Sequence, residues 1–474
     1  MFRDCCLHHG PTVSSDHHVE CRTLGSRYDT RRGHHHQHGP PTASKDSVRK
    51  VTVASMVGTV IEWFDFNLFG AMAALVLGPL FFPSDNPLTS TLLSLATFGV
   101  AFVARPFGGV LFGHFGDRYG RKKALVLALL MMGVGTFAIG LLPTYASIGI
   151  AAPILLVTLR LLQGLALGGE YGGAVLMVVE HEGAAKRRGL LGAWMGSASP
   201  IGYILSAGLI AITSALMPED AFNSWGWRVP FLLSAVMVIV GLYIRMSLEE
   251  SQAFKDVVEQ SKTPEVVKIP FVEMFKRYPR SVFSSIGAAL GIHAGYYLSI
   301  IFALAYARND VGFSATSSLV MVLIASVFYF FAILASGHIS DKVGRRAPML
   351  VGVIGFAVWV FALFPLIATH NALLAGLGFS VGLIFLGALF GPMSTWLAEL
   401  FGTQVRYTGI SFGYTIAAVI GGGITPALAV ALMDRFDSTI PISVFAAAIA
   451  VIAFLTILFT RHGLSHKEED LNNV

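Results

Sequence analysis

Long apolar runs separated by short polar segments fill the chain from residue 52 to residue 460. A helix needs about 20 consecutive apolar residues to cross a lipid bilayer. Runs of that order lie near 52–80, 89–112, 124–143, 152–179, 190–216, 226–247, 281–305, 317–339, 348–368, 372–398, 409–433 and 441–460. The pattern predicts an all-α polytopic membrane protein with 12 transmembrane helices.

The composition agrees with a chain that lies mostly in lipid. Of the 474 residues, 54% are hydrophobic and only 13% are charged, whereas soluble domains carry about 25% charged residues. The 50 glycines are expected to let helices approach one another closely, because packing in lipid favours small residues.

The distribution of Lys and Arg predicts the orientation of the chain. With the N-terminus inside, the inner loops carry 18 of these residues, and the outer loops carry only Arg228, Arg308 and Arg435. Both termini are therefore expected in the cytoplasm. The net charge of +5 follows from this bias, so the expected surroundings are a lipid bilayer and no nucleic-acid partner is expected.

One polar sequence occurs twice. Gly-His-Phe-Gly-Asp-Arg-Tyr-Gly-Arg-Lys contains Asp117 and returns as Gly-His-Ile-Ser-Asp-Lys-Val-Gly-Arg-Arg, which contains Asp341. A second polar loop begins at Glu180 and returns at Glu399. Repetition at half the chain length indicates two related halves. Two embedded halves that rock against each other can expose a site between them to either side of the membrane, as carriers do.

The repeats and the polar segments divide the chain into five parts. These are a His-rich cytoplasmic tail (1–47), an N-terminal six-helix half (48–247), a cytoplasmic linker (248–280), a C-terminal six-helix half (281–461) and a short cytoplasmic tail (462–474). The first tail holds all 3 Cys and 8 of the 15 His. Their spacing matches no zinc site, so a disordered extension is expected, with metal binding as the alternative. We expect no cofactor and no bound metal.

The repeated loops predict ion pairs that close the cytoplasmic side. Asp117 and Asp341 can face a helix N-terminus, whose partial positive charge favours a carboxylate. The basic residues of each loop can reach the Glu of the same half. We call the expected set the latch: Asp117, Arg118, Arg121, Glu180, Asp341, Arg345, Glu399 and Arg406. The alternative is that these charges only set the topology.

Ionisable residues within the apolar runs predict a proton site. Each costs about 2.5–3.5 kcal/mol at the bilayer centre. Glu62 and Asp65 share one helix face, where two carboxylates do not both stay charged in a low dielectric. One of them is expected to bind a proton, and the alternative is permanent pairing, for instance of Asp65 with Arg160. Arg105 is expected to serve the latch or to pair with Glu170. The predicted proton-coupling residues are Glu62, Asp65, Arg160 and Glu170.

Arg160 is the central candidate for holding a substrate. It keeps its charge at any accessible pH and can bind an anion through two parallel hydrogen bonds. His293 is expected to face the first half, although a structural role is the alternative for a lone His. The predicted substrate-binding residues are Arg160, Gln163, Trp63, Tyr171, His293, Tyr297 and Trp396.

Several motifs are similar to those of a known family. The loop from Gly113 to Lys122 resembles the signature loop of the major facilitator superfamily, and Arg160-Leu-Leu-Gln-Gly resembles its second motif. More narrowly, four segments resemble the metabolite:proton symporter family: Gly58–Phe66, Ala104–Gly109, Gly168–Gly173 and Trp225–Phe231. The resemblance covers residues 50–462 and implies the major facilitator fold of two pseudo-symmetric six-helix halves. In that superfamily the arginine that matches Arg160 is associated with proton coupling.

The resemblance also implies a function. Members of that family carry shikimate, α-ketoglutarate, citrate, aromatic acids, or proline and betaine. We therefore expect a symporter of a small-molecule substrate and a proton, working as a monomer in a bacterial inner membrane. Betaine carriers of the family often end in a charged coiled coil, which has no counterpart after residue 460, so an organic acid is expected and proline or glycine betaine is the alternative.

Other functional classes have less support. A drug:proton antiporter shares the fold, but the segment from Gly196 to Tyr203 lacks the paired glycines of that class. No nucleotide-binding loop is present, and His and Cys cluster only in the N-terminal tail. Neither an enzyme nor a channel is expected.

Overall fold

The computed structural model describes residues 45–119, 121–168, 187–246, 270–402 and 405–460. All of them belong to one compact unit, Ser44–Val474. Glu170, Tyr171 and Glu180 lie outside the described residues, as does nearly all of the N-terminal tail. The side chains of Asp117, Arg118 and Arg121 are likewise outside the described part of the structure.

The described residues of the first part form helices only, because a backbone in lipid has to satisfy its hydrogen bonds internally. In chain order they are α1 (Lys45–Met72), η1 (Ala73–Leu77), α2 (Gly78–Phe81), α3 (Pro87–Tyr119), α4 (Arg121–Leu141), α5 (Tyr145–Ile148), α6 (Ala151–Leu167), α8 (Arg188–Gly196), α9 (Ala198–Leu216), α10 (Glu219–Ala221), η3 (Phe222–Gly226) and α11 (Arg228–Met246).

The second part is also helical where it is described. Its elements are α13 (Pro270–Arg277), α14 (Pro279–Tyr297), η4 (Leu298–Phe302), α15 (Ala303–Asn309), α16 (Ala315–Val343), α17 (Arg346–Ile367), α18 (Ala372–Phe390), α19 (Met393–Glu399), α20 (Arg406–Ala418), η5 (Val419–Ile424), α21 (Thr425–Phe436) and α22 (Ile440–Phe459).

The helices reach the lengths that the apolar runs predicted. Within the described ranges, 9 are long and apolar enough to cross a membrane, and α10–η3 with α11 form a further span bent by 54°. Two shorter apolar helices, Val126–Leu141 and Ala151–Leu167, add to these. The set is consistent with the 12 spans expected from the sequence.

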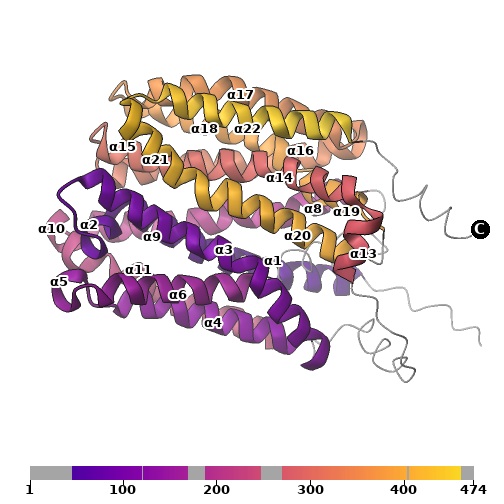
Figure 1. Cartoon of the computed structure of the whole chain (residues 1–474), viewed down its shortest axis with the longest axis horizontal. Helices are drawn as coiled ribbons and strands as arrows, with labels where there is room; N and C mark the ends of the chain where they lie inside the picture. The colour runs from indigo at the N-terminus through magenta and orange to yellow at the C-terminus, as the bar shows by residue number, and fades with distance from the viewer. Residues whose placement is uncertain (1–44, 120, 169–186, 247–269, 403–404, 461–474) are drawn as a thin grey trace, which may run out of the picture. The chain divides into compact units, whose positions relative to one another are not determined.

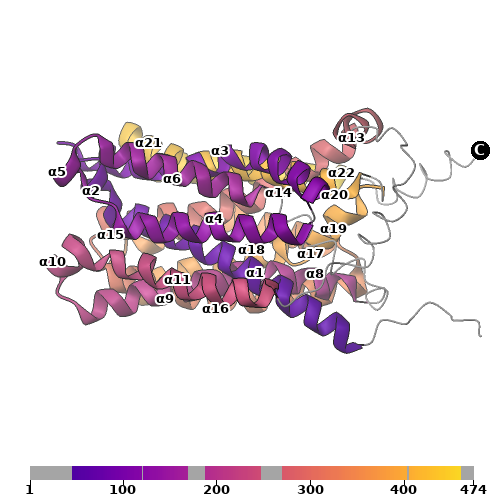
Figure 2. The ribbon, with the colours of Figure 1, turned by 90° about the horizontal axis from the view of Figure 1, so that it is seen from below.

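The long helices run side by side (Figure 1). Within the first part, α1 packs on α9 and α11, and α6 packs on α3 and α4. Within the second part, α18 packs on α16 and α17, and α14 packs on α20 and α22. The elements α2, α5, α10 and α15 gather at one end, and α8, α13 and α19 gather at the other (Figures 1 and 2). We call these the outer and the inner end, after the orientation expected from Lys and Arg.

The two parts meet along two seams. At one seam α16 lies along α8 and α9 (Figure 2), and at the other α3 lies along η5 and α21. Glycine allows the close approach at the second seam, because a Cβ atom on Gly99 would lie 2.4 Å from the carbonyl oxygen of Gly423. The contact between the parts is therefore close at the level of the backbone.

Two π-helical segments occupy matching places in the two parts. The segments η1 and η4 begin 225 residues apart (298 − 73), close to the 224 (341 − 117) that separate the repeated aspartates. A Cβ atom on Gly70, just before η1, would lie 2.5 Å from Cδ1 of Ile301 in η4. Short π segments within α-helices are frequent at functional sites, and these two lie where the parts meet.

Candidate functional site

One face of α1 places charged and aromatic side chains inside the protein. Glu62, Asp65, Phe66 and Phe69 follow the spacing of i, i+3, i+4 and i+7, so they line one side of the helix. All four side chains are buried. The sequence predicted the shared face of Glu62 and Asp65, and the aromatic residues complete it.

Glu62 is bonded to an arginine of α3. The Nη2 atom of Arg105 donates to Oε1 of Glu62 over 3.1 Å, and both side chains are less than one tenth exposed. The Arg105 guanidinium also lies 4.3 Å from the centre of the Phe66 ring. The prediction that Arg105 serves the latch was therefore wrong. The side chain lies alongside α1 within the membrane span, where the nearby carboxylate compensates its burial.

Arg160 of α6 is fully buried. Its Nη1 atom donates to Oε1 of Gln163 over 2.9 Å, and Nε2 of Gln163 donates to the Thr136 hydroxyl of α4 over 2.7 Å. The guanidinium lies 4.1 Å from the centre of the Phe69 ring and 4.9 Å from that of Phe66. The ring of Phe66 therefore contacts both buried arginines.

Asp65 lies near Arg160 but is not paired with it. The described residues provide no hydrogen-bond partner for either carboxylate oxygen of Asp65, and no ion pair joins it to Arg160 among them. Asp65 is nevertheless close enough to the Thr136 hydroxyl and to Arg160 to interact with both. Two nitrogen atoms of Arg160, Nε and Nη2, also have no partner in the described structure.

The second part contributes an aromatic wall to this site. Tyr297 of α14 packs edge-on against Phe98 and Phe102 of α3, with ring centres 5.4 Å and 5.2 Å apart. His293 stacks on Tyr297 and packs against Tyr414 of α20, at 6.2 Å and 4.4 Å. Tyr297 is therefore buried between the parts, and His293 is buried beside it against other residues of the second part. His293 faces other aromatic rings, and its Nε2 atom has no hydrogen-bond partner in the described structure.

The remaining predicted substrate residues lie in different places. Trp63 packs edge-on against Tyr296 with ring centres 5.8 Å apart, which puts it at the contact with the second part. Trp396 is buried on α19, a helix that packs on α8 at the inner end. Its role in binding stays a prediction. Sequence reasoning missed Thr136 and Phe69, because only the packing of α1, α4 and α6 brings them to Arg160.

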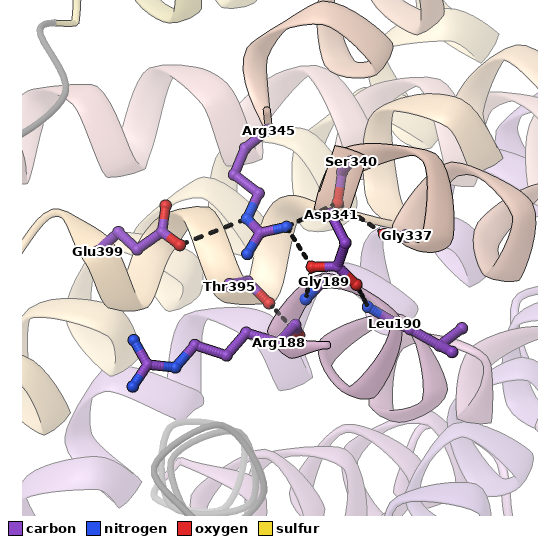
Figure 3. A network of polar contacts seen from close by, with 9 residues as sticks. All are labelled: Arg188, Gly189, Leu190, Gly337, Ser340, Asp341, Arg345, Thr395 and Glu399. Carbon is purple, nitrogen blue, oxygen red and sulfur yellow. Dashed lines mark hydrogen bonds and ion pairs between the residues drawn. The ribbon is translucent and has the colours of Figure 1, made fainter. Parts of the chain in front are cut away.

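A network of polar contacts joins the two parts at the inner end (Figure 3). The carboxylate of Asp341, at the end of α16, accepts hydrogen bonds from the backbone N–H groups of Gly189 and Leu190 over 2.8 Å and 3.0 Å. These groups begin α8, so Asp341 faces a helix N-terminus as the sequence suggested. The Thr395 hydroxyl of α19 donates to the Arg188 carbonyl over 2.8 Å, which adds a second link.

Arg345 connects the acidic residues of this network. Its Nη1 donates to Oδ1 of Asp341 over 2.6 Å, and its Nε donates to Oε1 of Glu399 over 3.3 Å. Arg406 donates from Nε to the Phe401 carbonyl over 3.0 Å. Three residues of the second copy of the predicted latch, Asp341, Arg345 and Glu399, are thus joined. The side chains of the first copy, Asp117, Arg118, Arg121 and Glu180, lie outside the described part of the structure.

The outer end is also bridged. Arg308 of α15 forms an ion pair with Glu219 of α10, and the hydroxyls of Ser214 and Thr316 lie 3.0 Å apart. The Glu219 side chain is 69% exposed. The parts are therefore in polar contact at both ends, with the more buried contact at the inner end.

Comparisons with known proteins agree with this architecture. A model of the Major Facilitator Superfamily matches residues 55–426. The inner membrane metabolite transport protein YhjE of Escherichia coli K12 is 40% identical over 440 residues, which cover 91% of this chain and 98% of that protein. The shikimate transporter of the same strain is 37% identical over 404 residues, covering 83% and 90%. Its proline/betaine transporter is 33% identical over 415 residues, covering 86% and 82%.

A solved structure shows the same fold. The xylose transporter XylE from E. coli, in a partially occluded inward-open conformation, matches with a TM-score of 0.67 over 88% of this chain and 98% of that chain, at 18% identity. The chain is therefore a multi-pass membrane transporter that belongs to the Major Facilitator Superfamily, in agreement with its resemblance to the metabolite:proton symporters.

Proposed function

We propose that the protein takes up a small organic acid together with a proton, by alternating access across a bacterial inner membrane with both termini in the cytoplasm. One observation carries the proposal: the buried Arg160 has two unpartnered nitrogen atoms and lies near the unpartnered carboxylate of Asp65. A relative named as a shikimate transporter and a solved structure named as a proton:xylose symporter support acid cargo and symport.

The free donors of Arg160 suit a carboxylate. A buried donor without a partner costs about 1–3 kcal/mol, and Nε with Nη2 forms one edge of the planar guanidinium. A carboxylate can accept from both atoms of such an edge in parallel. Because Arg160 stays charged, it can compensate the cargo for the hydration lost on entering the protein.

Asp65 is the better placed of the two carboxylates to carry the proton. Glu62 is already bonded to Arg105, whereas Asp65 has no ion pair and no hydrogen bond of standard geometry in the described structure. Burying an ionised carboxylate without a partner is far more costly than burying the neutral acid. A proton on Asp65 removes its attraction for Arg160, and the arginine is then left with its full charge for the cargo. Release of proton and cargo restores that attraction.

The inner and outer contacts provide the alternating step. Separation of the parts at the inner end requires the bonds between Asp341 and the start of α8 to break. Separation at the outer end requires the ion pair of Arg308 with Glu219 to break. Rocking about the central seams exposes the arginine site to one side at a time.

The experiment compares Asp65→Asn with Glu62→Gln in proteoliposomes. Asp65→Asn should abolish accumulation of labelled shikimate driven by a pH gradient and keep exchange of shikimate across the membrane. Glu62→Gln removes an anion from Arg105 and should impair exchange as well. If Asp65→Asn accumulates shikimate as the parent does, Asp65 is not the coupling residue.

Proline or glycine betaine is a second candidate cargo, favoured by the relatives named as proline/betaine transporters. A betaine carboxylate could use the same arginine, and aromatic faces such as those of Trp63 and Tyr296 attract a quaternary ammonium group. Competition of labelled shikimate uptake by glycine betaine, shikimate and 2-oxoglutarate separates the candidates. Strong competition by glycine betaine alone would show that the cargo is a zwitterion and not an organic acid.

A further inference from the structure

Next to the arginine site lies a second group of buried polar side chains. Asn67, Ser199, Tyr203 and Tyr296, which we call the neutral cluster, are each at most 3% exposed. Both amide atoms of Asn67 and the hydroxyls of the other three have no hydrogen bond of standard geometry in the described part of the chain. Buried polar groups are nearly always bonded, so four groups that reach one another without a bond of standard geometry leave hydrogen-bonding capacity for a ligand.

The four side chains come from both parts and converge. Tyr296 belongs to α14 of the second part, and its hydroxyl is within hydrogen-bonding reach of Ser199 of α9 and Asn67 of α1. The hydroxyl of Tyr203, one turn after Ser199 on α9, is close enough to interact electrostatically with that of Tyr296. The cluster is therefore enclosed where the parts touch, and it opens when they separate.

The cluster adjoins the arginine site. Asn67 lies two residues after Asp65, about 200° around α1, so the link to the arginine site runs through α14 and not along one face of α1. On α14, Tyr297 is near both arginines and the next ring, that of Tyr296, lies 5.2 Å from it. One molecule bound between the parts can thus reach the arginine site and the neutral cluster together.

The chemistry of the cluster selects its ligand. Each hydroxyl and the amide can both donate and accept hydrogen bonds, and none carries a charge. Alcohol groups match this set because they also donate and accept. A second carboxylate would meet no cation here, and a trimethylammonium group would leave every polar atom of the cluster unbonded.

We propose that Asn67, Ser199, Tyr203 and Tyr296 form a hydroxyl-recognition subsite, which makes the cargo a polyhydroxylated monocarboxylate. This inference rests on the proposed function, since Arg160 is taken to hold the carboxylate. It adds specificity, because a site built to bond hydroxyls discriminates strongly against an analogue that lacks them.

The test uses two probes that differ only in hydroxyl groups: shikimate, and cyclohex-1-ene-1-carboxylate, which is the same ring acid without them. Binding to the purified full-length protein is measured without any gradient, and uptake is measured separately in proteoliposomes with a pH gradient. The variants Tyr296→Phe and Tyr203→Phe each remove one hydroxyl and keep the ring. Tyr306→Phe is the matched control, because Tyr306 lies in the same span beside Phe302 and Phe364.

The parent should bind shikimate at least about tenfold more tightly than the deoxy acid, and each cluster variant should lose about tenfold of that preference. Affinity for the deoxy acid and all properties of Tyr306→Phe should stay unchanged. Equal binding of the two acids by the parent, an equal loss of both in the variants, or binding of neither would overturn the inference. Preferential binding without gradient-driven uptake would uphold the subsite and refute proton-coupled uptake instead.

Discussion

Replacing Asp341 by Asn should open the inner end of the protein. The carboxylate accepts two hydrogen bonds from the start of α8 and one from Arg345. The first two join the two parts, so their loss destabilises only the state in which the inner end is closed. Asn keeps one acceptor oxygen and presents an NH2 group to the second backbone N–H.

The size of the shift toward the inward-open state follows from the hydrogen bonds that Asp341→Asn loses. A hydrogen bond to a charged group contributes about 1.5–3 kcal/mol, and the Asp341 side chain is only 10% exposed. Loss of one such bond shifts the equilibrium toward the inward-open state by about 10- to 150-fold. The outer pair of Arg308 with Glu219 is much more exposed, and exposed pairs are worth about 0–1 kcal/mol. The inner contact therefore dominates the balance.

Cysteine labelling measures the shift. The three natural cysteines, Cys5, Cys6 and Cys21, are replaced by Ser, and a single reporter is introduced at the inner or the outer end. Ser394→Cys is an inner reporter, because Ser394 is fully buried on α19 and faces α8. Ser214→Cys is the outer reporter, at the contact with α16.

Asp341→Asn should speed thiol labelling at the inner reporter and slow it at the outer one. Asp434→Asn, a change at an exposed position of α21, is the matched control and should change neither rate. If both rates in Asp341→Asn equal those of the parent, the bonds to α8 do not hold the inner end closed. Faster labelling at both ends would indicate general loosening instead of a shift between states.

Three further changes test other parts of the structure. Arg160→Lys keeps the charge but loses the planar edge of donors, so the half-saturating concentration for acid uptake should rise at least about tenfold. An unchanged half-saturating concentration would show that Arg160 does not bind the substrate. Gly99→Ala places a Cβ atom 2.4 Å from a backbone oxygen across the seam, whereas Gly208→Ala, the control, makes only an ordinary contact at 3.7 Å. Overpacking of this kind costs about 1–3 kcal/mol, so Gly99→Ala should lower the melting temperature. Equal melting temperatures of the two variants would contradict the close seam. Burial, and then the charge of Asp437, raise the pKa of Asp310 above its ordinary value of 3.8. The folded protein therefore binds a proton on Asp310 more tightly than the unfolded chain does. The stability of the fold consequently falls as pH rises from 3.8 toward the raised pKa. Asp310→Asn should therefore melt higher than the parent at pH 7, with the difference shrinking toward pH 4, and a pH-independent difference would refute the assignment.

Some features of the site follow from the sequence because they depend on one helix at a time. Apolar runs of spanning length identify the membrane helices, and helical periodicity places Glu62 and Asp65 on one face of α1. The i, i+3 spacing also brings Gln163 to Arg160, where the structure has a hydrogen bond. The repeated loop predicted that Asp341 faces a helix N-terminus, but the helix that it meets, α8, lies 152 residues away, so the tertiary structure decided that partner.

Only the tertiary structure decided which groups meet across helices. Arg105 is 43 residues from Glu62, and nothing local to either residue distinguishes this partner from Glu170 or from the latch. The contact of Phe66 with both arginines depends on the crossing of α1 with α3 and α6. The neutral cluster needs α1, α9 and α14 to converge at the contact between the two parts. In lipid, apolar surface does not select one helix neighbour over another. Close packing at glycines and buried polar contacts therefore determine which helices pair. Both kinds of contact depend on the three-dimensional arrangement of the whole chain.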